Sequence, residues 1–250
     1  GGVASHAGFP ERAHVAAARA QMSADVILVV GSAPSYAHGV IDPISELAAL
    51  AVEHGKLMHV DACVGDCVLP FIRENGEEMT PCDFSVPGVP SMSMGGQWVK
   101  GKSCDGFAPM GIRIVLQRRC DLRNAQYFAC ASWSGYAIIN STTLGSKSVS
   151  AMGAAYALLH HLGREGYRER AAAMWAATKQ LVASIDALDG VHMVGRPGMN
   201  LFAFTTDGGD GPRQRGQRRR LHRRSERVRE RPSRNRRAAG SRARAAASRG

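Results

Sequence analysis

The stretch LMHVDACVGDCVLPF, residues 57–71, is the most informative for the fold, because it predicts one strand followed by turn-forming residues. An apolar run carries His59 and Asp61, then breaks at Gly65 and again at Pro70. Such a run, bounded by turn formers, is typical of a buried parallel strand. A carboxylate at the carboxyl end of this kind of strand lies where open α/β sheets bind their ligands. Asp61 is therefore either a site residue, whose burial would require a partner, or a cap of the following turn.

The segments before this strand predict a βαβ unit. Residues 26–30, VILVV, form a compact β-branched run that ends at a Gly-Ser-Ala-Pro turn. Residues 44–54 place apolar side chains at helical spacing, and residues 11–22 have high helix propensity. Strand, helix and strand at this spacing indicate a right-handed crossover and a parallel sheet.

Further helices and strands are expected after residue 71, and the last strands, at residues 191–194 and 200–204, predict a separate α+β unit. The expected strands or extended segments are residues 82–87, 112–117, 191–194 and 200–204, and the expected helices are residues 149–162 and 167–188.

The basic residues are concentrated at the end of the chain. The formal net charge is +11, but sixteen arginines and two glutamates lie between residues 213 and 250. The rest of the chain has sixteen basic and nineteen acidic residues, a net charge of −3. The tail has too few apolar residues to fold, so we expect it to be disordered. It is either an arginine-rich arm that binds nucleic acid nonspecifically or a product of GC-rich DNA read out of frame, which the abrupt change in composition after Asp210 favours.

Membrane and disulfide signals are weak in this sequence. No apolar run approaches the roughly 18 residues of a membrane span, and the first residues do not resemble a signal peptide. The six cysteines are scattered in a chain too long to need disulfides. Cys63 and Cys67 lack the CxxC spacing of a zinc or redox site, so we expect buried thiols. These features predict a cytoplasmic protein.

One motif match points to nucleotide binding. Residues 96–103, GQWVKGKS, fit the P-loop pattern GxxxxGK[ST]. A P-loop requires a helix directly behind it, and Gly106, Pro109 and Gly111 argue against a helix there. We therefore regard the match as accidental.

The order of several motifs resembles the fold-type I enzymes that depend on pyridoxal 5′-phosphate (PLP), in the branch of sphingosine-1-phosphate lyases and group II decarboxylases. The matching stretches are VGSAPSYAHGVIDPI (30–44), HVDAC (59–63), LPF (69–71), DFSVPGVPSMS (83–93), GFAP-MG (106–111), QYF (126–128), TLGSK (143–147) and HLGREGY (161–167).

The resemblance implies an α/β fold. We expect an incomplete PLP-binding large domain with a mostly parallel sheet at residues 1–140, part of a small α+β domain at 141–210, and the arginine-rich tail at 211–250. The family's phosphate-binding loop and the end of its small domain are not recognisable in the sequence. We therefore expect an internal fragment of a longer protein, as a frameshifted gene would give.

The resemblance also implies a function, that of a PLP-dependent carbon–carbon lyase. Such an enzyme, an aldehyde-lyase or a decarboxylase, acts on a small and sometimes phosphorylated amino substrate through an external aldimine, in a homodimer. Asp61 would face the pyridine nitrogen, which keeps the ring electron-accepting, and Ala62 would pack under the ring. The other expected site residues are His59, Ser32 and Ser146 for the cofactor and Tyr36 and Lys147 for the substrate.

The lysine that should form the Schiff base is out of register. Lys100 and Lys102 are the candidates, but neither aligns with the family position counted from either side, and Met110 replaces the family's second lysine. Either the loop brings Lys100 or Lys102 to the cofactor, or the chain has no such lysine. In the second case it would be a catalytically inactive fragment whose tail binds polyanions.

Overall fold

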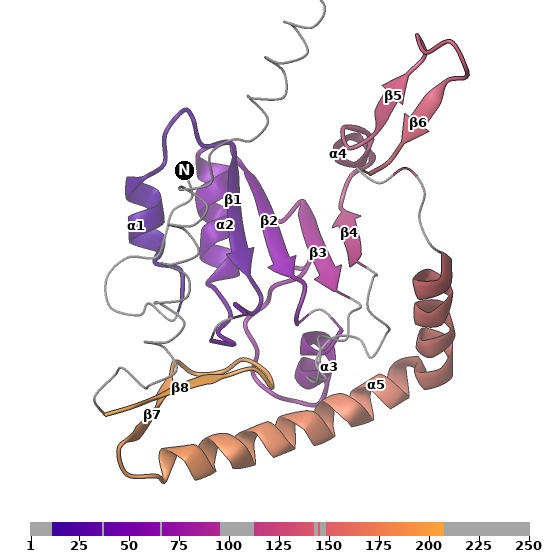
Figure 1. The fold of residues 1–250 in the computed structure, drawn as a ribbon. Helices are drawn as coiled ribbons and strands as arrows, with labels where there is room; N and C mark the ends of the chain where they lie inside the picture. Colours follow the sequence, from indigo (N-terminus) through magenta and orange to yellow (C-terminus); the bar gives the residue numbers. More distant parts are fainter. Residues whose placement is uncertain are drawn as a thin grey trace, which may run out of the picture. The chain divides into compact units, whose positions relative to one another are not determined.

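The computed structural model describes residues 12–36, 38–65, 67–95, 113–142, 145 and 149–207. The chain divides into two units, residues 1–205 and 206–250, and only Thr206 and Asp207 of the second are described. The elements, shown in Figure 1, are α1 (Val15–Ala20), β1 (Leu28–Ser32), α2 (Ile44–Glu53), β2 (Leu57–Ala62), α3 (Leu69–Glu74), β3 (Ser91–Gly95), β4 (Arg113–Gln117), α4 (Cys120–Asn124), β5 (Phe128–Cys130), β6 (Ile138–Asn140), α5 (Val149–Asp186), β7 (Val191–Val194) and β8 (Ala203–Thr206).

A four-stranded sheet in the order β1-β2-β3-β4 forms the centre of the first unit. The predicted parallel βαβ unit is confirmed, since β1 pairs with β2, and β2 with β3, in parallel. The register places Ser32 opposite Asp61, and Asp61 opposite Ser93. β4 runs antiparallel to β3, so Arg113 at its start lies opposite Gly95. The carboxyl ends of three strands and the start of a fourth therefore share one edge.

Helix α2 covers one face of this sheet and forms most of the core with it. Met58 and Val60 on β2 and Ile44 on α2 are completely buried, and Leu47 is 2% exposed. The helix comes close because β1 has glycine at its fourth position. A Cβ at Gly31 would lie 2.6 Å from Cδ1 of Ile44.

The other face of the sheet is open within the described part of the chain. Leu28, Val30, Leu57 and Val115 lie on this face and are 44–54% exposed. The parallel strand predicted at the start of residues 57–71 is confirmed, but its expected burial is only partial among the described residues, because burial alternates along β2. Parallel sheets are normally covered on both faces, and here α2 covers one of them.

The third strand is not where the sequence places it. Residues 82–87 form turns, because the Asp83 carboxylate accepts a hydrogen bond of 2.7 Å from the Ser85 amide. The Arg118 guanidinium also donates to the carbonyl oxygen of Val89 at 2.9 Å and to that of Phe84, which fixes the curved backbone. The strand is instead Ser91–Gly95, whose serines and glycine give little strand signal.

The two helices expected after residue 149 are continuous in α5 except for a sharp kink. Gly163 interrupts the helix with a φ of +57°, at the residue expected to end the first helix. Strand β7 is confirmed at residues 191–194, and β8 begins three residues later than expected. α5 has 38 residues, yet neither it nor any other described helix is apolar enough to cross a membrane. The domain boundaries after residues 140 and 210 stay predictions.

A substitution on α2 tests whether this helix forms the core. We expect Leu47→Ala to lower the free energy of unfolding by about 2–5 kcal/mol, because it leaves a cavity under the sheet. Val52→Ala, on the exposed side of the same helix, should change it by no more than about 0.5 kcal/mol. Urea denaturation measures both values. Equal effects at the two positions would contradict the packing of α2 on the sheet.

Candidate functional site

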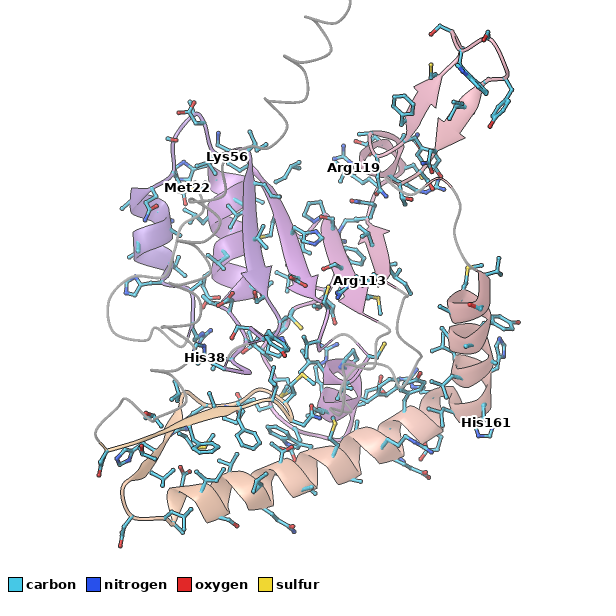
Figure 2. All side chains as sticks on the ribbon, viewed as in Figure 1. Met22, His38, Lys56, Arg113, Arg119 and His161 are labelled. Carbon is cyan, nitrogen blue, oxygen red and sulfur yellow. The ribbon has the colours of Figure 1, made fainter. Side chains whose placement is uncertain are left out.

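Polar side chains gather at the edge where the parallel strands end. Ser32, Asp61 and Ser93 share one register row and point from the open face of the sheet. Figure 2 shows Arg113 at the start of β4, next to the arrowheads of β2 and β3. Since this is the edge at which α/β sheets bind ligands, these residues form the candidate site.

The Asp61 carboxylate joins β2, β3 and the turn after β2. Its Oδ1 accepts a hydrogen bond from the backbone amide of Cys63 at 3.1 Å and another from the Ser93 hydroxyl at 3.1 Å. Asp61 thus caps the following turn, as one of the two sequence interpretations proposed. Asp61 lies on the open face of the sheet and is exposed there, so the burial considered from the sequence is at most partial. Both of these hydrogen bonds reach Oδ1, and neither of them uses Oδ2.

The hydrogen bonds keep this carboxylate ionised. Partial burial by itself would raise the pKa of Asp61, but the bonds from Cys63 and Ser93, together with nearby His59, outweigh it. The pKa of Asp61 therefore lies below its ordinary value. A stable negative charge at this edge suits a cationic group on a ligand, such as a protonated ring nitrogen.

The Cys63 thiol belongs to the same cluster. Its Sγ donates a hydrogen bond of 3.3 Å to the Ser93 hydroxyl oxygen, which in turn donates to Asp61. Burial and the adjacent Asp61 carboxylate raise the pKa of the thiol, while nearby Arg113 opposes that rise. Cys63 is therefore a neutral donor and not a thiolate nucleophile. Cys63 and Cys67 are half-buried and neither forms a disulfide, so the expected burial is only partial.

His59 lies two residues before Asp61 on the same face of β2. Its Nδ1 is 2.8 Å from the Ser91 hydroxyl oxygen on β3. Burial lowers the pKa of His59, and the Asp61 carboxylate only partly offsets this. A neutral imidazole therefore lies beside the carboxylate, held by the serine that precedes Ser93 on the same face.

Asp42 fixes the end of β1 next to this cluster. Its Oδ2 accepts from the Ser32 amide at 2.7 Å, and its Oδ1 accepts from the Ala13 amide at 2.8 Å. Its own amide donates to the Ser32 carbonyl at 2.9 Å, and the Ala33 amide donates to the Asp61 carbonyl at 2.9 Å. One carboxylate thus ties the strand end to the loop that follows it and to the segment before α1.

Two glycines allow the loops at this edge to pack closely. A Cβ at Gly95, the last residue of β3, would lie 2.1 Å from the Cys63 carbonyl oxygen. A Cβ at Gly65 would lie 2.4 Å from the Ala33 carbonyl oxygen. Larger residues at these positions would push apart the turn after β2, the end of β3 and the loop after β1.

The structure brings together only some of the residues expected to form the site. His59 and Ser32 share the face of Asp61, whereas the Ala62 side chain is 1% exposed and lies in the core on the opposite face. Tyr36 is 63% exposed in the loop after β1. Lys100, Lys102, Ser146 and Lys147, the P-loop match at residues 96–103 and the tail at 211–250 lie outside the described residues.

Sequence reasoning missed four residues that shape the site: Asp42, Cys63, Ser93 and Arg113. Period-2 spacing along β3 and β4 would have placed Ser93 and Arg113 on one face, had the β3 strand been recognised. Asp42 has no comparable signal, because its role depends on contacts between separate segments.

Known proteins resemble this chain in both sequence and fold. It is 38% identical over 193 residues to the sphingosine-1-phosphate lyase of Arabidopsis thaliana, an alignment that covers 77% of this chain and 34% of that protein. It is 30% identical over 196 residues to a probable L-tyrosine/L-aspartate decarboxylase of Methanothermobacter thermautotrophicus, covering 77% of this chain and 51% of that protein. No protein-family model matches the chain.

Solved structures of a sphingosine-1-phosphate lyase and a decarboxylase also resemble this chain in fold. The sphingosine-1-phosphate lyase of Burkholderia pseudomallei is 34% identical, with a TM-score of 0.73 over 78% of this chain and 43% of that one. The glutamate decarboxylase of Lactobacillus brevis, 22% identical with a TM-score of 0.54 over 68% of this chain and 37% of that one, supports the fold alone. The chain spans about a third of the length of the sphingosine-1-phosphate lyases that it matches, 34% for the Arabidopsis protein.

Ser91 and Ser93, which lie on the same face of β3, allow a matched test of the Asp61 cluster. Ser93→Ala removes a hydrogen bond to the carboxylate, so we expect the pKa of Asp61 to rise. Ser91→Ala removes the contact to His59 instead and should change the pKa of Asp61 less than Ser93→Ala does. Carbon-detected NMR of the Asp61 carboxyl group gives both values. The same shift in both variants would contradict the assigned hydrogen bonds.

The same contacts predict how stability depends on pH. Because the pKa of Asp61 is lower in the folded than in the unfolded chain, its contribution to stability is present above pH values of about 4. It is lost as the pH falls through the folded-state pKa. Ser93→Ala should therefore reduce stability at pH 7 and have less effect under more acidic conditions.

Proposed function

We propose that this chain carries part of a lyase site, because it belongs to the fold-type I family of PLP-dependent enzymes that contains the sphingosine-1-phosphate lyases and group II decarboxylases. One observation supports the proposal most directly. The ionised Asp61 carboxylate stands at the carboxyl edge of a parallel sheet, held through Oδ1 by Ser93 and Cys63.

The residues of this edge fit PLP. Asp61 would hold a proton on the pyridine nitrogen through Oδ2, and Ser93 and Cys63 would keep that carboxylate charged and oriented. His59 and Ser32 would line the same face, and Cys63 would contact the ring in place of Ala62, whose side chain lies in the core. When bound, PLP supplies an electron-accepting ring for cleavage of a bond at the carbon that bears the substrate amine.

We propose that a lysine from the 96–112 segment, Lys100 or Lys102, carries the cofactor. An amine that attacks or binds a carbonyl must first lose its proton, which a desolvated position near a cation favours. Arg113, directly after this segment, provides such a cation at the edge of the sheet. Ser146 and Lys147 would contact a phosphate, and Tyr36 would contact the substrate.

The substrate class follows from the relatives. Several proteins that match over three quarters of this chain are named sphingosine-1-phosphate lyases, and one is named a probable L-tyrosine/L-aspartate decarboxylase. We propose a small amino substrate, with carbon–carbon cleavage of a phosphorylated amino alcohol as the reaction and decarboxylation as the close variant. A cytoplasmic location is consistent with five described cysteines that form no disulfide.

We further propose that the chain forms a homodimer through the first part of α5. Residues 149–162 contain no Asp, Glu, Lys or Arg, whereas residues 164–186 contain seven. An apolar stripe on this uncharged part is 52–66% exposed and consists of Val149, Met152, Tyr156 and Leu159. A helix without charged side chains is normally buried against another element.

The stripe is complementary to a second copy of itself. Its spacing is symmetric about residue 154, so an antiparallel copy would place Met152 against Tyr156 of the second copy, and Val149 against Leu159. Such pairing buries no charge on either side, and a two-fold interface requires this kind of self-complementarity. The second part of α5 uses its charges within the chain, since Arg164 binds Glu74 at 2.9 Å and Lys179 binds Glu77 at 2.6 Å.

Cofactor binding tests the proposed site. Titration of the full chain with PLP, followed by absorbance, should show saturable binding that Asp61→Ala weakens about 10-fold or more, as expected for the loss of a charged hydrogen bond. Asp25→Ala, near the opposite edge of the sheet, should bind as the parent does. Borohydride reduction and peptide mass spectrometry should find a pyridoxyl group on Lys100 or Lys102. Equal PLP affinity of the parent chain and Asp61→Ala would contradict the proposal, as would a pyridoxyl adduct spread over many lysines.

Sedimentation velocity tests the proposed dimer. Met152→Lys and Tyr156→Glu should each weaken dimerisation about 10-fold or more, because each buries an unpaired charge. An equimolar mixture of the two variants should dimerise again, since the lysine introduced in one variant then faces the glutamate introduced in the other. Ala173→Glu, on the exposed side of the second part of α5, serves as the control. A monomeric parent chain, or no recovery in the mixture, would rule out this interface.

A further inference from the structure

A cavity of about 400 Å³ lies apart from the Asp61 cluster, where several segments of the chain meet. Its walls come from Arg12, the β1–α2 loop (which carries His38 in Figure 2), the segment after α3, helix α5 and the turn between β7 and β8. Its volume falls in the range of small-molecule sites, about 300–1,000 Å³. A second cavity, between α3 and α5, has only about 140 Å³.

Backbone contacts fix two walls of the cavity. The Gly198 amide donates a hydrogen bond of 2.8 Å to the Gly39 carbonyl oxygen, which joins the β7–β8 turn to the loop after β1. Gly39 has a φ of +69°, and a Cβ there would lie 1.6 Å from the Leu201 carbonyl oxygen. A Cβ at Gly198 would lie 2.7 Å from Cδ1 of Ile41. The approach to a backbone carbonyl at Gly39 requires glycine, so this wall of the cavity is set by the backbone.

The charged groups of the cavity favour an anion. Arg12, Arg196 and Glu78 line it, which gives two guanidinium groups against one carboxylate. None of the ion pairs between described residues involves any of these three. Arg19, Arg73, Arg119, Arg164 and Arg168, by contrast, all pair with carboxylates. Guanidinium groups with unused donors bind phosphate or carboxylate oxygens in pairs.

The remaining lining is largely apolar. Val40 and Ile41 are buried at 6% and 8% exposure and form one wall. Met79, Pro197 and the indole of Trp175 add further apolar surface. A ligand that matches both kinds of surface carries an oxyanion on an apolar body.

We infer that this cavity binds an amphiphilic anion, a phosphate or carboxylate attached to an alkyl or aryl group. Arg12 and Arg196 bind the oxyanion, and Ile41 and Met79 contact the apolar part. The lining shares no residue with the cluster of Asp61, Ser93 and Cys63, so this site does not depend on the proposed cofactor site.

Isothermal titration of the full chain in the absence of PLP tests the inference. The ligands are octyl phosphate, octanoate, inorganic phosphate and octanol, each titrated into the parent chain, Arg196→Gln and Arg119→Gln. Arg119 pairs with Asp121 on the surface and does not line the cavity, so it is a control for the loss of one positive charge. The arginine-rich tail is identical in all three proteins, so its binding of anions cancels in the comparison.

We expect octyl phosphate or octanoate to bind more tightly than inorganic phosphate and octanol, and the tighter of the two identifies the oxyanion. Arg196→Gln should weaken that binding about 10-fold, the usual effect of losing a charge-assisted hydrogen bond. Arg119→Gln should stay within about twofold of the parent. No binding of either amphiphile, octanol binding as tightly as the anions, or equal losses in the two variants would overturn the inference.

Discussion

The parallel alignment of β1, β2 and β3 is the constraint on which the candidate site depends. Only this alignment brings Ser32, Asp61 and Ser93 into one row, although they come from three separate segments. The row becomes a cluster because the Ser93 hydroxyl donates to the Asp61 carboxylate across the strand pair. The antiparallel β4 then adds Arg113 at the same edge, so that a cation and an anion both face the open side of the sheet.

The hydrophobic pattern was enough to predict the elements that carry the strongest periodicity. Strands β1 and β2, helix α2 and the break at Gly163 follow from apolar spacing and from glycine, and the motif HVDAC led to Asp61. β3 escaped prediction because SMSMG has no β-branched residue, and its stability comes from neighbours on both sides. The depressed pKa of Asp61 was only partly accessible, because Cys63, which lowers it most, is two residues away, whereas Ser93 lies thirty-two residues away in the chain.

Two surfaces of the described chain remain apolar and exposed. One is the open face of the sheet, with Leu28, Val30 and Leu57, and the other is the uncharged first part of α5. The aligned part of this chain corresponds to about a third of each of these relatives, so most of their length lies outside the alignment. An apolar sheet face and an uncharged helix are normally covered by another element, so both surfaces of the described residues are consistent with the proposed pairing of two copies.

The central claim is that Asp61 pairs with a protonated pyridine nitrogen. The most direct measurement is the ¹⁵N chemical shift of PLP labelled at its ring nitrogen and bound to the full chain at neutral pH. The proposed site predicts the shift of a protonated pyridinium, which changes to that of a neutral pyridine in Asp61→Ala. A neutral-pyridine shift in the parent chain, or the shift of free PLP at saturating protein, would contradict it.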